Sequence, residues 1–428
     1  MLDRRKIPEI SALKGMNVRV PEKYVLKNGI PLQVIQAGSQ EVVRMDILMG
    51  GGQWHQTQPL QALFTNRMLR EGTQTMTSAQ IAEKLDYYGA WLELSSSVSH
   101  GFITLYSLNK YFPKTLEIVS EVLKNPLFPD KELDVVREVN RRQFLVNQSK
   151  VEVIARKRLN QLLFGEHHPF GYYVQLEDYD RITSDVLRTF YHKYYHSGNC
   201  SIYVSGKVTE DIIHCVEDKL GTSAWGESQE VACLTRVEPT CLRQKRLFVE
   251  KEDALQSALK IGGFMVDQHH PDFLKLRILV TLFGGYFGSR LMANIREDKG
   301  YTYGIGAGMA TCPGHGIMVI STEADNQYVE SIITEVYHEM DRLKEELVPL
   351  EELEMVKNYM LGDWCRSYEG PFSLADAWIY VETSKLDKDF YTRSLEAIQT
   401  ISREEIRTLA QKYFIKENFV EVIAGKKI

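Results

Sequence analysis

The sequence contains an internal duplication, and this feature constrains the fold more than any other. Residues 182–207 align without a gap to residues 401–426, at an offset of 219 residues. The two segments, ITSDVLRTFYHKYYHSGNCSIYVSGK and ISREEIRTLAQKYFIKENFVEVIAGK, share polar residues in register and match at their apolar positions. Each segment is typical of a capped amphipathic helix, an Asn-containing turn and a buried strand. The repeat therefore predicts two similar domains.

Apolar periodicity predicts a similar order of elements in both halves. In the first half we expect strands at 24–35, 42–50, 91–97 and 102–106, and helices at 60–70, 78–88, 112–124 and 130–147. In the second half we expect strands at 246–250, 257–264, 303–310 and 316–322, and helices at 271–283, 288–296, 327–344 and 350–369. This pattern predicts an α+β fold, an α/β sandwich in which each domain packs a mainly antiparallel sheet against helices.

The boundary between the two domains is expected where the periodicity weakens. Residues 221–242 are rich in Gly, Ser, Pro and polar side chains, which is typical of a linker. The expected domains are therefore residues 1–220 and residues 243–428.

Composition narrows the function classes. The chain has 428 residues, of which 44% are hydrophobic and 25% charged, enough for two or three domains with a substantial core. The net charge of -6 gives no electrostatic footprint for nucleic acid or an anionic membrane. No apolar run is long enough to cross a bilayer, and the N-terminal segment MLDRRKIPEI is not typical of a signal peptide. Six cysteines without a C-x-x-C pair indicate a reduced compartment, so we expect a cytoplasmic protein.

One segment of the second half carries candidate catalytic chemistry. Residues 284–303 read GGYFGSRLMANIREDKGYTY and place Arg290, Arg296 and Tyr303 around a helix end and the start of the next strand. A guanidinium and a phenol hydroxyl both donate hydrogen bonds, so both suit a site where negative charge develops. Taken alone, the spacing also fits an Arg at a helix C-terminus and an aromatic residue in a strand.

Four features, spread over nearly the whole chain, together resemble the pitrilysin or insulinase-type metallopeptidases, also called inverzincins. Two of them are the duplication and the segment at 289–303. The third is Arg-Glu-Gly-Thr at 70–73, followed by a helix and the strand at 89–94. The fourth is Asn-Pro-Leu-Phe at 125–128 before an acidic helix, with Phe-Gly and His-Pro-Phe-Gly within 164–171.

The resemblance also shows which part of the family pattern is missing. Active members carry His-x-x-Glu-His on the helix before the Gly-Thr pair, and a Glu further along the chain is the third zinc ligand. At the motif positions this chain has Leu63, Asn66 and Arg67. The third-ligand position falls near Arg142 or Gln143. None of these side chains replaces the missing ligands, so we expect no metal site in this chain.

One other pair of histidines has helical spacing. His192 and His196 are four residues apart, as in a metal-binding pair, but the Glu that either zincin motif requires is absent. The second copy of the repeat has Gln411 and Ile415 at these positions. The sequence therefore favours a solvated helix face.

The resemblance implies a zinc-free subunit of a two-chain bacterial peptidase. In such enzymes one chain holds zinc, its partner supplies an Arg and a Tyr, and the two close like a clam shell around unfolded peptides. By this resemblance Arg296 and Tyr303 bind the substrate carbonyl and the oxyanion at the partner's zinc site, and Arg290 binds substrate. The chain would hold no cofactor itself and would be inactive alone. Its partner would be a zinc-bearing paralogous subunit in a heterodimer, or a second copy in a homodimer, and the assembled complex would be a metalloendopeptidase. The peptide is expected to add as a strand to an exposed sheet edge.

Two alternatives belong to other classes. Family members without zinc also serve as catalytically inactive structural or scaffold subunits of larger complexes, and there the Arg and Tyr would be residual. A self-sufficient metalloprotease would need metal ligands that the sequence does not contain.

Overall fold

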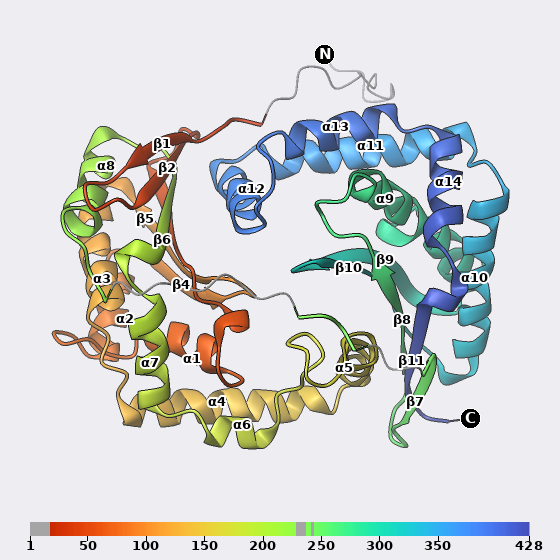
Figure 1. Cartoon of the computed structure of the whole chain (residues 1–428), viewed down its shortest axis with the longest axis horizontal. Coiled ribbons are helices and arrows are strands. Elements are labelled where there is room, and N and C mark those ends of the chain that lie inside the picture. The colour runs from red at the N-terminus through yellow and green to blue at the C-terminus, as the bar shows by residue number, and fades with distance from the viewer. Residues whose placement is uncertain (1–17, 228–236, 241–243, 428) are drawn as a thin grey trace, which may run out of the picture.

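The computed structural model describes residues 18–227, 237–240 and 244–427. It contains two sheets, one in each half of the chain, which stand on opposite sides of the view in Figure 1. Helices cover the outer flanks of both sheets and run between them at the top and bottom of that view. No helix within these residues is long and apolar enough to cross a membrane.

The first sheet has six strands in the order β1-β2-β6-β3-β5-β4. Its neighbours are antiparallel except β2 and β6, which run parallel. The strands are β1 (Glu22–Val25), β2 (Pro31–Gln36), β3 (Val42–Met49), β4 (Trp91–Ser96), β5 (Gly101–Leu108) and β6 (Cys200–Gly206).

The second sheet repeats this arrangement without a counterpart of β1. Its order is β7-β11-β8-β10-β9, and only β7 and β11 run parallel. The predicted fold class, two homologous units with mainly antiparallel sheets packed against helices, is confirmed. The strands are β7 (Arg246–Glu250), β8 (Ser257–Met265), β9 (Thr302–Cys312), β10 (His315–Ala324) and β11 (Phe419–Gly425).

The predicted repeat is also confirmed. The first copy forms α7 (Ser184–Tyr194), a 3-10 turn and β6, and the second forms α14 (Arg403–Tyr413), a 3-10 turn and β11, each element shifted by 219 residues. Side chains cap both helices: Thr183 accepts a hydrogen bond from the Val186 N–H, and Ser402 accepts one from the Glu405 N–H.

The helices lie mostly where the periodicity predicts them, with some omissions. Five helices were not predicted, namely α5, α6, α8, α12 and α13. The first half has α1 (Gln61–Met68), α2 (Ser78–Tyr87), α3 (Phe112–Lys124), α4 (Asp130–Gln148), α5 (Val151–Phe164), α6 (Leu176–Asp180) and α8 (Glu210–Val216). The second half has α9 (Phe273–Val280), α10 (Val329–Glu345), α11 (Leu350–Ser367), α12 (Pro371–Thr383) and α13 (Phe390–Thr400).

The prediction of one continuous strand at residues 24–35 is wrong. Residues 24–35 form two strands, β1 and β2, because Asn28 and Gly29 turn the chain between them. Gly29 has a φ of 90°, which a glycine adopts without steric cost, and its N–H donates to the Leu26 carbonyl.

Each half lends one helix to the sheet of the other half (Figure 1). Helix α5 packs on β8 and β11 of the second sheet, where Leu159 lies in one apolar cluster with Val422. Helix α12 packs on β2 and β6 of the first sheet, where Trp378 lies in one cluster with Tyr203. The two helices stand at equivalent places in the repeat, so the exchange is reciprocal.

Ion pairs to buried charges of the sheets, Lys260 and Arg44, fix both exchanged helices. On α5, Glu152 pairs with Lys260 of β8 at 3.1 Å. On α12, Asp376 pairs with Arg44 of β3 at 2.6 Å, and the same guanidinium pairs with Asp46 at 2.9 Å. Burial is the largest effect on Asp46 and raises the pKa of its carboxyl, although Arg44 acts in the opposite direction.

The predicted division into residues 1–220, 221–242 and 243–428 stays a prediction, and part of the predicted linker lies outside the described residues. The packing of α5 and α12 crosses this division in both directions.

Replacing Glu382 with Ala is expected to loosen α12. The Glu382 carboxylate accepts hydrogen bonds from the Ser201 and Tyr203 hydroxyls, both at 2.6 Å, and from the Gln33 amide. Losing these contacts should cost about 2 kcal/mol, because hydrogen bonds to a charged acceptor are the stronger kind. Hydrogen exchange of α12 should then accelerate roughly 30-fold if α12 opens locally.

The matched control is Glu396→Ala on α13, an exposed Glu whose side chain forms no hydrogen bond or ion pair among the described residues. It should shift stability by no more than about 0.5 kcal/mol. Equal exchange of α12 amides in both variants would contradict the anchoring role of Glu382.

Candidate functional site

Arg296 and Tyr303 lie on two segments that a tight turn brings together. Arg296 belongs to a π-helical segment, Met292–Asp298, where a regular helix was predicted. Gly300 then turns the chain with a φ of 66°, and Tyr303 follows at the start of β9, an edge strand. The Tyr301 N–H donates to the Ile295 carbonyl at 3.0 Å and closes the turn. Single π-helical turns often accompany functional sites.

The two predicted side chains are in contact, together with a third. The Arg296 guanidinium lies 5.4 Å from the centre of the Tyr303 ring and 4.5 Å from that of Phe287. Tyr303 is 91% exposed and Phe287 is 62% exposed. Among the described residues no carboxylate forms an ion pair with Arg296. Stacking therefore holds the cation while its N–H groups stay available for a ligand.

Phe287 was not predicted as part of this site. The available signal was an aromatic residue directly before a glycine in the loop that leads to the Arg-bearing segment.

Arg290 has different surroundings from Arg296. Its guanidinium forms a two-point contact with Glu352 of α11, at 2.8 and 3.0 Å, and lies 4.0 Å from Glu339 of α10. Only 9% of Arg290 is exposed. These contacts tie the Arg-bearing segment to two helices, and the predicted binding of substrate by Arg290 stays a prediction.

The positions of the missing zinc motif lie on α1. Leu63 and Arg67, one turn apart, are the two half-buried residues of this helix, and the others are buried. Asn66 is fully buried, and its amide donates to the Tyr195 hydroxyl at 3.1 Å. Burial raises the pKa of Tyr195, while the bond from Asn66 acts in the opposite direction.

Arg67 contacts α4. Its guanidinium donates a hydrogen bond to the Asn140 side chain. Arg142 and Gln143, proposed above for the third-ligand position, are exposed instead. Asn140 lies on the face of α4 toward α1, and by the helical period the other two residues lie beyond that face. Burial lowers the pKa of Arg67; Tyr179 counteracts this shift and Arg70 adds to it.

These residues do not fit a zinc ion. Leu63 has no ligand atom, the Asn66 amide is engaged inside the protein, and Arg67 is a cation. In the described part of the chain, no group of three or more His, Cys, Asp or Glu could hold a metal. The prediction of a solvated histidine face is half wrong, because His192 is exposed while His196 lies buried just beyond the end of α7. Burial lowers the pKa of His196.

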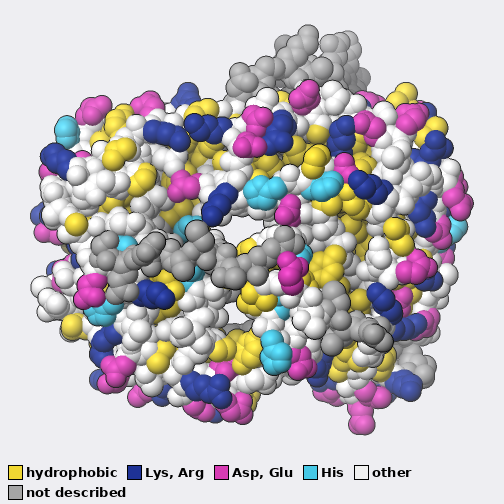
Figure 2. Space-filling view, viewed as in Figure 1, with side chains coloured by type: hydrophobic (Ala, Val, Ile, Leu, Met, Phe, Trp, Pro, Cys, Tyr) yellow, Lys and Arg dark blue, Asp and Glu magenta, His cyan; other side chains and the backbone are white. Residues whose placement is uncertain are grey.

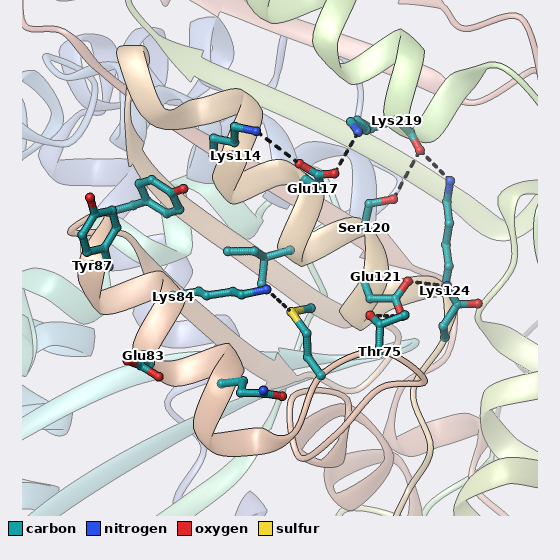
Figure 3. Close-up of a pocket in the computed structure, with 15 residues that line it drawn as sticks. Thr75, Glu83, Lys84, Tyr87, Lys114, Glu117, Ser120, Glu121, Lys124 and Lys219 are labelled. Atoms are coloured by element: carbon teal, nitrogen blue, oxygen red, sulfur yellow. Dashed lines mark hydrogen bonds and ion pairs between the residues drawn. The ribbon is translucent and has the colours of Figure 1, made fainter.

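A large cavity of about 850 Å³ lies elsewhere, between α2 and α3 (Figure 3). Most of its charged groups already have partners within the cavity. Glu117 pairs with Lys114 and Lys219, and the Lys124 ammonium donates to the Lys219 carbonyl. Glu121 accepts hydrogen bonds from neighbouring Thr and Asn side chains. None of the predicted site residues lines it.

Known protein families match both halves of the chain. Residues 36–169 match the family described as insulinase (peptidase family M16). Residues 181–360 match the family described as the peptidase M16 inactive domain. Together the two matches cover most of the chain.

Individual relatives also point to the M16 peptidase family. An uncharacterized zinc protease YmxG of Bacillus subtilis is 23% identical over 353 residues, which cover 81% of this chain and 84% of the relative. A non-peptidase homolog YmxG of Helicobacter pylori is 24% identical over 56% of this chain and 55% of its own length. The crystal structure of a peptidase M16 inactive domain from Pseudomonas fluorescens superposes with a TM-score of 0.86 at 20% identity, covering 95% of this chain and 98% of that one. The chain belongs to the insulinase family of peptidases, M16.

Proposed function

We propose that this chain is the zinc-free subunit of a two-chain peptidase and that Arg296 and Tyr303 act at the zinc site of a partner chain. The partner is a paralogous subunit that carries the zinc motif. The chain alone binds peptide, and the assembled pair cleaves it.

The observation that carries this proposal is the Arg296 side chain, stacked between Phe287 and Tyr303 without an ion-pair partner in the described residues. A cation that only stabilised the fold would be expected to sit beside a carboxylate, as Arg290 does. An exposed phenol next to an unpaired guanidinium offers two hydrogen-bond donors to an oxyanion.

The position of Tyr303 also suits peptide binding. Strand β9 pairs with β10 along one side, and its other side is an edge of the sheet. A peptide that adds to this edge as a further strand would pass beside Tyr303. Main-chain pairing makes limited sequence demands, in agreement with an enzyme that takes unfolded peptides.

The shape of the molecule supports pairing with a second chain. Figure 2 shows an opening between the two halves of the molecule. The periplasmic protease PqqL of Escherichia coli has a similar structure, with a TM-score of 0.77, and this chain spans only 49% of it. We infer that a partner supplies the other half of a closed chamber. The relatives described above are bacterial, while the cytoplasmic location stays a prediction.

The second candidate function is an inactive scaffold subunit. It is favoured by the description of one relative as a non-peptidase homolog. In a scaffold, Arg296 and Tyr303 would contribute nothing to turnover, and this difference separates the two proposals.

The purified chain is expected to bind no stoichiometric zinc, as measured by elemental analysis after dialysis. Restoring the ligands should restore the metal, because two imidazoles and a carboxylate form a zinc site. We expect zinc binding in the triple variant Leu63→His, Arg67→His, Asn140→Glu.

The matched control places the carboxylate on the exposed side of α4, in the triple variant Leu63→His, Arg67→His, Gln143→Glu. Weaker zinc binding is expected there, since Gln143 does not face α1. One zinc per wild-type chain, or equal binding in both triple variants, would contradict this account of the site.

Reconstitution with a zinc-bearing paralogue tests the role of the second half. Tyr303→Phe removes only a hydroxyl and Arg296→Ala removes the guanidinium, so each should lower turnover of an unstructured peptide roughly 10²-fold to 10³-fold. Assembly of the two chains, measured by analytical ultracentrifugation, should be unaffected.

Tyr301→Phe is the matched control, since it deletes the same group only two residues before Tyr303. The Tyr301 ring stacks on Tyr328, with 4.8 Å between the ring centres, and the substitution keeps this contact. Its turnover should equal that of the wild type. Full turnover in both Tyr303→Phe and Arg296→Ala, with assembly intact, would favour the scaffold.

A further inference from the structure

A second cavity, of about 440 Å³, lies beside the exchanged helix α5. Its walls come from α5, from the end of α4 and from the segment that leads to α6. Lys157, Arg158 and Tyr173 line it, together with the side-chain amides of Gln148 and Gln175. None of the residues that line this cavity is Arg296, Tyr303 or one of the three α1 residues at the zinc-motif positions.

Lys157 is a half-buried cation without a carboxylate partner in the described residues. Its ammonium lies 4.8 Å from the centre of the Phe144 ring and 5.4 Å from that of Tyr173. Burial is the main cause of its lowered pKa, and Arg156 and Arg158 lower the pKa further. The side chain is thus desolvated, next to charges of its own sign, and compensated only by aromatic rings.

Its two neighbours on α5 are better satisfied. Arg156 pairs with Glu152 at 3.6 Å, and Arg158 donates to the Gln161 side chain at 2.7 Å. Arg156 thus has a carboxylate partner, whereas Lys157 and Arg158 both bring positive charge to the cavity without one among the described residues.

Tyr173 provides a second unsatisfied donor in the same cavity. Its hydroxyl is buried and has no hydrogen-bond partner among the described residues. Burial raises the pKa of this hydroxyl, so it keeps its proton and can donate it. A buried donor is rarely left unpaired in a native protein, which indicates that a ligand or water supplies the acceptor.

The remaining walls indicate what kind of anion would fit. Gln148 presents an amide group, which matches the main chain of a peptide in both donor and acceptor capacity, while the Gln175 amide already donates to the Tyr173 carbonyl at 3.1 Å. Glu166 also lines the cavity and would repel an anion, but its carboxylate accepts a hydrogen bond from Gln161. With Lys157 and Arg158 against Glu166, the charged lining has an excess of positive charge when His167 is neutral.

We propose that this cavity binds a carboxylate of a peptide, with the Lys157 ammonium and the Tyr173 hydroxyl as the donors. The choice of a peptide as ligand rests on the proposed function. The carboxylate is either the C-terminus of the peptide or an Asp or Glu side chain. The site would hold one part of a peptide away from Arg296 and Tyr303, and so favour peptides that carry a carboxylate at a fixed distance from the cleaved bond.

Calorimetric titration of the isolated chain tests this proposal. The probes are three forms of one short unstructured peptide: without acidic side chains and with a free C-terminus, the same peptide amidated, and the amidated peptide with one internal Glu. The free acid is expected to bind at least about 10-fold more tightly than the amide, because a charge-assisted hydrogen bond contributes at least this much. The third probe shows whether a side-chain carboxylate also serves.

Three single substitutions distinguish a specific binding site from non-specific electrostatic attraction. Lys157→Gln should abolish the difference between acid and amide, and Tyr173→Phe should reduce it several-fold. Arg156→Gln removes the same charge from the adjacent residue and should leave the difference intact. Circular dichroism verifies that each variant is folded, and Tyr173→Phe keeps the test valid if Lys157→Gln does not fold.

Equal affinity of the wild type for the acid and both amidated peptides would overturn the proposal, as would equal losses in Lys157→Gln and Arg156→Gln. Because these titrations use the isolated chain, their failure leaves the turnover test of Arg296 and Tyr303 unaffected. Conversely, a scaffold with no role in turnover could still show this binding.

Discussion

The exchange of α5 and α12 between the two sheets is the constraint on which the rest of the structure depends. Each sheet buries one face against helices of its own half and needs a helix of the other half to cover part of the second face. Asp46 and Lys260 make this dependence specific. In the strand register, Asp46 lies opposite Tyr203 and Lys260 lies opposite Val422. Tyr203 and Val422 are equivalent in the repeat, so Asp46 and Lys260 hold equivalent places on the central strands β3 and β8. Lys260 pairs directly with Glu152 of α5. Asp46 pairs with Arg44 of its own strand, and Arg44 pairs in turn with Asp376 of α12. Separating the halves would take Glu152 from Lys260 and Asp376 from Arg44, and a buried charge that loses a partner is costly, so neither half is expected to be complete alone.

This arrangement leaves certain surfaces open and thereby positions the candidate site. The exchanged helices cover the middle of each sheet, while β4 and β9 remain at the edges. Arg296 and Tyr303 lie at the start of one of these edges, on a segment that Arg290 ties to α10 and α11 through Glu339 and Glu352. The ion pairs of Arg290 therefore support a site whose own cation has no such pair within the described part of the chain. Rigid support behind an exposed, unpaired donor is what preorganised stabilisation of an oxyanion requires.

The sequence predicts the part of this architecture that depends on local pattern. The 219-residue repeat, the fold class and the neighbourhood of Arg296 and Tyr303 follow from periodicity, capping and spacing. Helices α5 and α12 were missed because their burial comes from a sheet in the other half. Helix α12 buries six of its thirteen residues, Leu374, Ala375, Ala377, Trp378, Ile379 and Val381, and has little of the polar stripe that marks a surface helix. The contact between Asn140 and Arg67 was missed for a related reason. Packing decides which face of α4 meets α1, and the local pattern does not show this. The unpaired state of Arg296 and Lys157 is likewise a property of the assembled surroundings.

Leu63, Asn66 and Arg67 lie on α1, where the resemblance places the zinc motif, and their chemistry opposes a metal there. Leu63 merely lacks a ligand atom, whereas Arg67 places a positive charge at a ligand position of the family's zinc site. Two unit charges 4 Å apart at an effective dielectric of 20 interact by about 4 kcal/mol, so a divalent ion would be repelled by roughly 8 kcal/mol. That repulsion opposes a metal even where other ligands are present, and Asn140 holds the guanidinium in place. The donors of the second half are not affected, because they lie on the other sheet. A half that opposes a metal and a half that exposes two donors are therefore physically compatible, and under the proposed function the metal for these donors would come from another chain.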